Sequence, residues 1–283
     1  MLFYSLIHSR GMSSVLNFLL NILAIVTLAA LLYYAVKHLQ REGFVSSSYP
    51  PVTFLSAAET KQFFQEDYDE YVHTLSQWDL LARHVATFQD YINKISKSSM
   101  SFTEEQKDRL RKAAFEADEF FRTTSINGID CEKIQFIPWI FGLTRGIEYE
   151  DGLPHTRADK IFISTILDQV HSTLVRTLIH EKVHLYQRLH PGDMMAWLEQ
   201  NRYYRWKQRF GVPRIRANPD LDPWIYFDPN TKKPMTAFYV SDNPANINDV
   251  ILDSPLSEHP YELVAYKIAE KYDNKIKLKA KGI

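Results

Sequence analysis

The feature that most constrains this chain is an uncharged stretch near its N-terminus. Residues 14–36 read SVLNFLLNILAIVTLAALLYYAV and contain no Asp, Glu, Lys or Arg. As a helix, a segment of this length would extend roughly 35 Å, enough to cross a hydrocarbon core of about 30 Å. Tyr33 and Tyr34 lie near the end of the stretch and Lys37 follows it, as at a membrane interface. We therefore predict a single-pass transmembrane anchor over residues 14–36, with the lipid bilayer as its partner.

Two alternatives are open for this stretch, a cleaved signal peptide and a buried core helix. The apolar region of a signal peptide normally spans only about 7–15 residues and ends at a small-residue cleavage site. The flank that carries more Lys and Arg usually faces the cytosol, but the two flanks of this stretch are nearly balanced in these residues. The flanking charges therefore do not indicate which way the anchor would cross the membrane. The absence of an Asn-X-Ser/Thr sequon and of paired cysteines favours a main domain that faces the cytosol.

The composition narrows the class of partner and of metal site. The chain has 33 Lys+Arg against 34 Asp+Glu, a net charge of -1, so it lacks the excess positive charge that binds phosphate backbones. Nucleic acid is therefore not an expected partner. The single cysteine, Cys131, excludes an intramolecular disulfide and a Cys-rich metal site. Any metal bound here must be held by histidines and carboxylates.

Pattern and composition divide the chain into five segments. They are an N-terminal tail (1–13), the anchor (14–36), a linker (37–56) rich in Ser and Pro, a helical region (57–125) and a mixed region (126–283). The mixed region alternates helical patterns with short β-like runs, so we expect a helix-dominated α+β domain with a small β component.

Local signals place several elements within these segments. Helical periodicity over 57–95 predicts two helices with a break near Ser76, and Thr103 with Gln106 forms a capping box that predicts another helix to about Thr124. The predicted strands are Lys160–Ser164 and a hairpin of Trp224–Phe227 with Met235–Val240.

One helical segment carries a metal-binding pattern. Its periodicity predicts a helix from Ser164 to the stop at Pro191, and within it lies HEKVH, His180 to His184. Residues i and i+4 lie on one face of a helix, so two imidazoles at this spacing can bind the same Zn²⁺ ion. Glu181 would lie beside the metal, where a carboxylate can accept a proton from metal-activated water.

The HExxH segment resembles the zincin metallopeptidases. The resemblance implies one Zn²⁺ ion held by His180 and His184, Glu181 as the general base, and hydrolysis of a peptide or protein substrate. It covers mainly residues 160–272, so a zincin-like metal-binding domain would occupy 126–283. Lys182 departs from the pattern, because an uncharged residue is usual at that position.

A catalytic zinc site needs a third protein ligand, and several residues are candidates. His190 lies at the metzincin spacing, but Gln187 replaces the glycine that lets the chain turn back to the metal. Glu262 follows Pro260, a favoured first residue of a helix, and this placement resembles the gluzincins, in which a downstream helix supplies a glutamate. We predict Glu262 as the third ligand. The alternatives are His259, His190, Asp242, Asp249 and Asp253.

Further roles follow from the resemblance and from the chemistry. An oxyanion would need a hydrogen-bond donor, for which the candidates are Tyr261, Tyr266, His259, Tyr239 and His155. Lys160–Ser164 precedes the HExxH helix where zincins often carry the edge strand that pairs with substrate. The expected function is a membrane-anchored zinc metallopeptidase of the gluzincin type. The alternatives are an inactive zincin-like binding or structural protein and a zinc hydrolase of a non-peptide amide or ester.

Overall fold

The structure, a computed structural model, describes residues 49–217, 222–255 and 257–280. It is 48% helical and 17% strand, which confirms a mixed α+β fold dominated by helices. The predicted tail (1–13) and anchor (14–36) lie outside the described residues. Within the part of the chain that the structure does describe, no helix is both long and apolar enough to cross a bilayer.

The larger sheet has five strands. Three run parallel in the order β1 (Val52–Phe54), β3 (Trp139–Thr144) and β5 (Lys160–Ile163), and the short β2 (Ser99–Met100) pairs antiparallel with β3. Beyond β5 lies β4 (His155–Arg157), antiparallel to it and in the outermost position. The expectation that Lys160–Ser164 forms the edge strand is therefore wrong, because the preceding residues fold back and cover that edge.

The helices between residues 57 and 122 begin at residues whose side chains cap them. Ser56, Ser76, Thr87 and Thr103 each form a capping box with the residue three positions on. The helices are α2 (Ala57–Glu66), α3 (Gln77–Ala82), α4 (Phe88–Lys97) and α5 (Glu104–Arg122), with a short 3-10 turn, η1 (Val72–Thr74). The predicted break at Ser76 and the capping box at Thr103 are confirmed, but Thr87 begins an additional helix.

The long helix predicted from Ser164 is shorter at its start. Residues Thr165–Asp168 form a 3-10 turn, η3, and α7 runs from His171 to Leu189. Ser164 does not cap it, because its hydroxyl donates instead to the Gly146 carbonyl. The predicted stop is confirmed, since Pro191 begins a separate helix, α8 (Pro191–Gln200). The remaining helices are α6 (Cys131–Phe136) and α9 (Pro260–Ala280).

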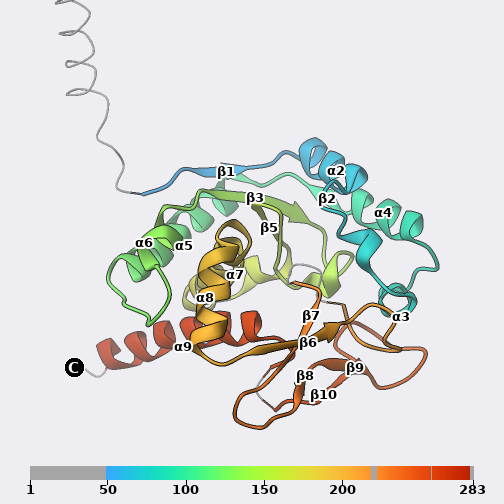
Figure 1. Cartoon of the computed structure of the whole chain (residues 1–283). Helices are drawn as coiled ribbons and strands as arrows, with labels where there is room; N and C mark the ends of the chain where they lie inside the picture. Colours follow the sequence, from blue (N-terminus) through green and yellow to red (C-terminus); the bar gives the residue numbers. More distant parts are fainter. Residues whose placement is uncertain (1–48, 218–221, 256, 281–283) are drawn as a thin grey trace, which may run out of the picture. The chain divides into compact units, whose positions relative to one another are not determined.

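The main core lies where α5, α7 and α9 meet the larger sheet. Ala265 and Ala269 of α9 are fully buried, and these small side chains allow α9 to lie close along α7 (Figure 1). The core draws residues from both sides of the predicted boundary at 125/126, and β1 lies inside the predicted linker at 37–56. The predicted helical region (57–125) and the predicted mixed region (126–283) therefore share one core, and β1 of the predicted linker belongs to it as well.

Two small antiparallel sheets come from the segment between α8 and α9. One contains β6 (Tyr204–Gln208), β7 (Trp224–Phe227) and β8 (Pro234–Met235), and the other contains β9 (Ala237–Tyr239) and β10 (Val250–Leu252). The predicted hairpin is confirmed where β7 pairs with β8. Its second arm is shorter than predicted, because the chain after Met235 leaves β7 and pairs with β10.

Candidate metal centre

Two histidines one helical turn apart form the base of the site. His180 and His184 lie on the same face of α7, and their Nε2 atoms are 3.0 Å apart. The two rings are nearly perpendicular, at 78°. The i, i+4 spacing of the helix therefore directs both ring nitrogens at one point in space.

A carboxylate from a second helix completes the group. Glu262 lies in the first turn of α9, which begins at Pro260 as predicted. Its Oε2 is 3.4 Å from Nε2 of His180, and its Oε1 is 3.4 Å from Nε2 of His184. Burial disfavours the charged carboxylate, but the facing imidazoles outweigh burial and hold the pKa of Glu262 well below its ordinary value.

The spacing of these three donors fits a zinc ion. At zinc–ligand distances of about 2.0–2.2 Å, a tetrahedral ion holds its donor atoms roughly 3.3 Å from one another. The two Nε2 atoms are 3.0 Å apart, each faces a different oxygen of Glu262 at 3.4 Å, and one donor atom from each of the three residues lies within 4.8 Å of the others. Two imidazoles and a carboxylate are ligand types that zinc accepts, and three protein ligands leave a fourth position open. Binding of zinc itself remains a prediction.

A glutamine orients the second histidine. Oε1 of Gln187 is 2.8 Å from Nδ1 of His184, and Nε2 of Gln187 donates to the Tyr261 carbonyl at 3.0 Å. The carbonyl can only accept, so it fixes the orientation of the amide and makes Nδ1 of His184 the donor. The lone pair of His184 is then on Nε2, which faces Glu262 and His180.

The other residues considered as third ligands lie elsewhere. His190 is the C-cap residue of α7, and its ring is tilted by 38° against that of Tyr186, with the ring centres 5.1 Å apart. His259 hydrogen-bonds to Asp222 at 3.0 Å, and Asp253 accepts from Thr236 at 2.9 Å. Asp249 accepts from the Ala245 amide and Asp242 from the Trp78 indole. Among the described residues, Glu262 is the candidate that meets both imidazoles.

The predicted base, Glu181, is buried and held in place by the edge strand. Thr156 lies on β4, and its hydroxyl donates to Oε2 of Glu181 at 2.8 Å. Among the described residues no donor bonds to Oε1 of Glu181, so this oxygen can accept a proton. Packing of α7 against the outermost strand therefore sets the position of this carboxylate.

The unexpected charge at Lys182 faces away from the three donors. Its ammonium group is buried, forms an ion pair with Asp118 and donates to the Gln135 carbonyl at 2.9 Å. It also lies 4.2 Å from the centre of the Trp139 ring. Burial lowers the pKa of Lys182 to about 8, although Asp118 opposes the change. Lys182 thus connects α7 to α5 and β3.

A pocket of about 390 Å³ opens beside the three donors. His180, His184, Glu181 and Glu262 line one side of it. Other lining residues come from distant parts of the chain: Tyr71, Arg83, Glu150, His155, Arg216 and Tyr266. The cluster is therefore accessible to a ligand rather than sealed in the core.

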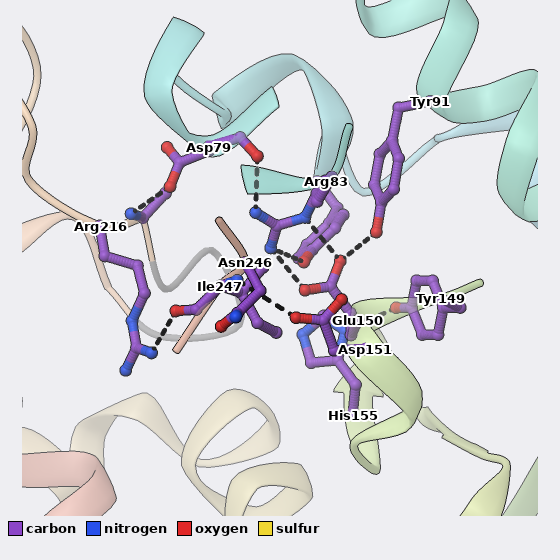
Figure 2. Close-up of polar contacts among 12 residues, drawn as sticks. Asp79, Arg83, Tyr91, Tyr149, Glu150, Asp151, His155, Arg216, Asn246 and Ile247 are labelled. Carbon is purple, nitrogen blue, oxygen red and sulfur yellow. Dashed lines mark hydrogen bonds and ion pairs between the residues drawn. The ribbon is translucent and has the colours of Figure 1, made fainter. Parts of the chain in front are cut away.

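Arg83, Glu150 and His155, which also line the pocket, belong to a buried polar network (Figure 2). Arg83, the C-cap residue of α3, donates to both carboxylate oxygens of Glu150, and Tyr91 donates to the same group. Burial opposes the charge on Glu150, but Arg83 outweighs it and lowers the pKa of Glu150 to about 2. Glu150 and Asp151 have φ of 45° and 52°, a strained backbone that such a network can hold in place.

Of the predicted oxyanion donors, Tyr266 and His155 line the pocket. The ring of Tyr266 lies 4.6 Å from that of His180, and burial, together with nearby carboxylates, raises the pKa of Tyr266 to about 12. Its hydroxyl therefore keeps a proton to donate. Tyr239 bonds to Asp79 instead, and neither it nor Tyr261 lines the pocket. His259, bonded to Asp222, is also outside.

Comparison of the chain with protein-family models, curated proteins and solved structures finds no match. The site is therefore described from its own residues. Sequence reasoning missed Gln187 and Thr156. Gln187 has a local signal, since residues i and i+3 are neighbours on a helix. Thr156 has none, because a threonine on a short strand is ordinary and its partner lies 25 residues away.

Proposed function

We propose that this protein is a membrane-anchored, zinc-dependent metallopeptidase in which His180, His184 and Glu262 hold one Zn²⁺ ion and Glu181 is the general base. The observation that carries the proposal is the three-donor cluster at zinc spacing in the wall of an open pocket, next to a buried carboxylate. A purely structural zinc site needs four protein ligands and no base.

The residues around the cluster have the chemistry that peptide hydrolysis requires. Zinc bound there would act as a Lewis acid and lower the pKa of a water molecule to about 7. Glu181, held by Thr156 at Oε2, would accept the proton of that water and pass it to the departing amine. Tyr266 would donate a hydrogen bond to the carbonyl oxygen as its negative charge develops.

The arrangement of elements supports a zincin-like domain of the gluzincin type. The HExxH residues lie on α7 and the third donor lies on a downstream helix, α9. Glu262 lies 78 positions after His184, a spacing that is long for a compact gluzincin, and α8 with two small sheets lies between them. We also propose that residues 14–36 anchor this domain to a membrane and that it faces the cytosol.

The test is cleavage by the purified full-length chain. Incubated with zinc and a mixed peptide library, the wild type should produce cleaved peptides, and a chelator should abolish them. Glu181→Gln should lower kcat/KM by at least about 100-fold while its zinc content stays near one ion per chain. Glu270→Gln, on an exposed face of α9, is the matched control and should cleave like the wild type.

The outcomes separate the proposal from its alternatives. Full zinc occupancy without cleavage of any peptide, protein, ester or amide would overturn the enzyme and favour a binding protein. Cleavage of ester or non-peptide amide probes alone would assign a different hydrolase. Cleavage that survives both the chelator and Glu181→Gln would rule out this centre as its source.

A further inference from the structure

Outside the pocket, strand β6 exposes an unusual set of side chains. All five of its residues, Tyr204–Gln208, are exposed, and among the described strands its partner is β7 alone. Tyr204 is 62% exposed, Trp206 is 49% exposed and Phe210, just beyond the strand, is 53% exposed. Large aromatic side chains grouped at one exposed edge indicate a binding surface rather than ordinary surface.

The same segment is strongly basic. Residues 201–217 contain six Lys and Arg and no Asp or Glu, whereas the chain as a whole has a net charge of -1. The rest of the chain therefore carries a net charge of -7. Three of the six cations are neutralised by ion pairs: Arg205 with Asp222, Arg214 with Asp242 and Arg216 with Glu258. The basic residues of the segment are Arg202, Arg205, Lys207, Arg209, Arg214 and Arg216.

The cations and the aromatic rings lie together. Nζ of Lys207 is 4.4 Å from the centre of the Trp206 ring, and that ring is 5.2 Å from the ring of Phe227 on β7. Arg202 is exposed at the turn before β6, with φ of 62°. Among the described residues, no carboxylate forms an ion pair with Arg202 or Lys207. Both charges are therefore available to an anionic partner.

We propose that this surface, formed by Arg202, Tyr204, Trp206, Lys207 and Phe210, docks on the anionic phospholipid headgroups of a bilayer. Trp and Tyr concentrate at the membrane interface, and Lys and Arg beside them are attracted to anionic headgroups. We name it the β6 surface. This role is separate from the metal centre, because none of its five residues lines the pocket.

A basic, aromatic surface could bind either an anionic bilayer or a nucleic acid. The position of the predicted anchor favours the bilayer. Twelve residues, 37–48, separate the predicted anchor (14–36) from residue 49, where the described structure begins. A chain of that length can reach at most about 40 Å. An anchored domain would therefore stay within reach of the headgroups, where even weak attraction is effective. The β6 surface supplies the local positive charge and interfacial aromatics for such contact.

The test uses the full-length chain in proteoliposomes made with brominated lipids, which quench a tryptophan that touches them. The contribution of Trp206 is the difference between the wild type and Trp206→Phe. In phosphatidylcholine vesicles with phosphatidylserine, this contribution should be quenched, and the quenching should fall in high salt. In vesicles of phosphatidylcholine alone, it should be small.

Charge variants give a second readout. Removing one basic residue should lower the affinity of the β6 surface for anionic vesicles about fivefold. The double variant Arg202→Gln with Lys207→Gln should lower this affinity by roughly 25-fold, and quenching of Trp206 should no longer depend on phosphatidylserine. Lys97→Gln with Lys112→Gln removes two exposed lysines elsewhere and should change nothing. Equal quenching of the wild type and Trp206→Phe in anionic vesicles would overturn the proposal. Binding of a single-stranded oligonucleotide through the same residues, without lipid quenching, would also overturn it.

Discussion

Nδ1 of His184 and Oε1 of Gln187 lie 2.8 Å apart, and the glutamine is held in turn by the Tyr261 carbonyl of α9. This contact places a hydrogen-bond bridge between the two helices that carry the three candidate metal donors. His180 has no counterpart: within the described structure, its buried Nδ1 has no hydrogen-bond partner. The two histidines are therefore held differently, although they occupy equivalent positions of the motif.

Replacing Gln187 should weaken zinc binding without unfolding the chain. Gln187→Ala removes the acceptor that fixes the tautomer of His184, and loss of such a partner typically lowers metal affinity by about 10–100-fold. Competition with a chromophoric chelator would measure this change. Gln169→Ala, at an exposed glutamine that precedes α7, should leave the affinity unchanged. Wild-type affinity in Gln187→Ala would show that the bridge does not position His184.

Loss of Glu262 should have a larger effect than loss of Gln187. Glu262→Ala removes a direct donor, so zinc affinity should fall by more than about 100-fold, beyond the range for a supporting residue. Metal analysis of the dialysed full-length chain would then find little zinc. Glu270→Ala, on the same helix but exposed, should retain about one ion. Retention of zinc by Glu262→Ala would assign the third donor to another residue.

Thr156 should affect turnover more than metal binding. Thr156→Val keeps the shape of the side chain but removes the hydroxyl that donates to Glu181, at a cost of about 1.4 kcal/mol, or tenfold. We expect kcat/KM to fall about tenfold at unchanged zinc content. Thr156→Ser, which restores the donor, should recover most of the rate. A loss of zinc in Thr156→Val would instead assign the residue a structural role.

The Glu150 carboxylate should make stability depend on pH in the acid range. Its pKa is about 2 in the folded chain against an ordinary 4.5, so the charged form favours folding above pH 4.5 and this contribution disappears as the pH falls towards 2. Between pH 7 and pH 3, about 2 kcal/mol of it should be lost. Urea unfolding at both values would measure the loss. Glu150→Gln should be less stable at pH 7 and show a pH dependence smaller by this amount.

The buried Lys182–Asp118 pair should be sensitive to removal of one partner. Lys182→Met leaves the Asp118 carboxylate buried and unpaired, and should lower the free energy of unfolding by about 3–5 kcal/mol. Adding Asp118→Leu removes the orphaned charge and should recover much of this loss. Zinc affinity should stay the same in any variant that folds, since Lys182 faces away from the metal donors. If the double variant loses as much free energy of unfolding as the two single variants together, Lys182 and Asp118 are not coupled.

Local features of the site could be predicted from the sequence because helix geometry is local. The spacing of His180 and His184 determines that both rings share a face of α7, whatever surrounds it. Pro260 likewise indicated where α9 begins, and so placed Glu262 in its first turn. The capping box at Thr103 and the β7/β8 hairpin were predictable because their partner residues are also close in sequence.

The tertiary structure decided what depends on contacts between distant segments. Whether Glu262 meets the two histidines is set by the packing of α9 on α7, with Ala265 and Ala269 buried in the core that the two helices share. The edge position of β4, and with it the Thr156 contact to Glu181, follows from strand order, which residue periodicity does not specify. The sequence alone determined that His180, Glu181 and His184 lie on one helix with both histidines on the same face, because those positions repeat with the helical turn. Only chain packing could bring Glu262 and the supporting hydrogen bonds to them.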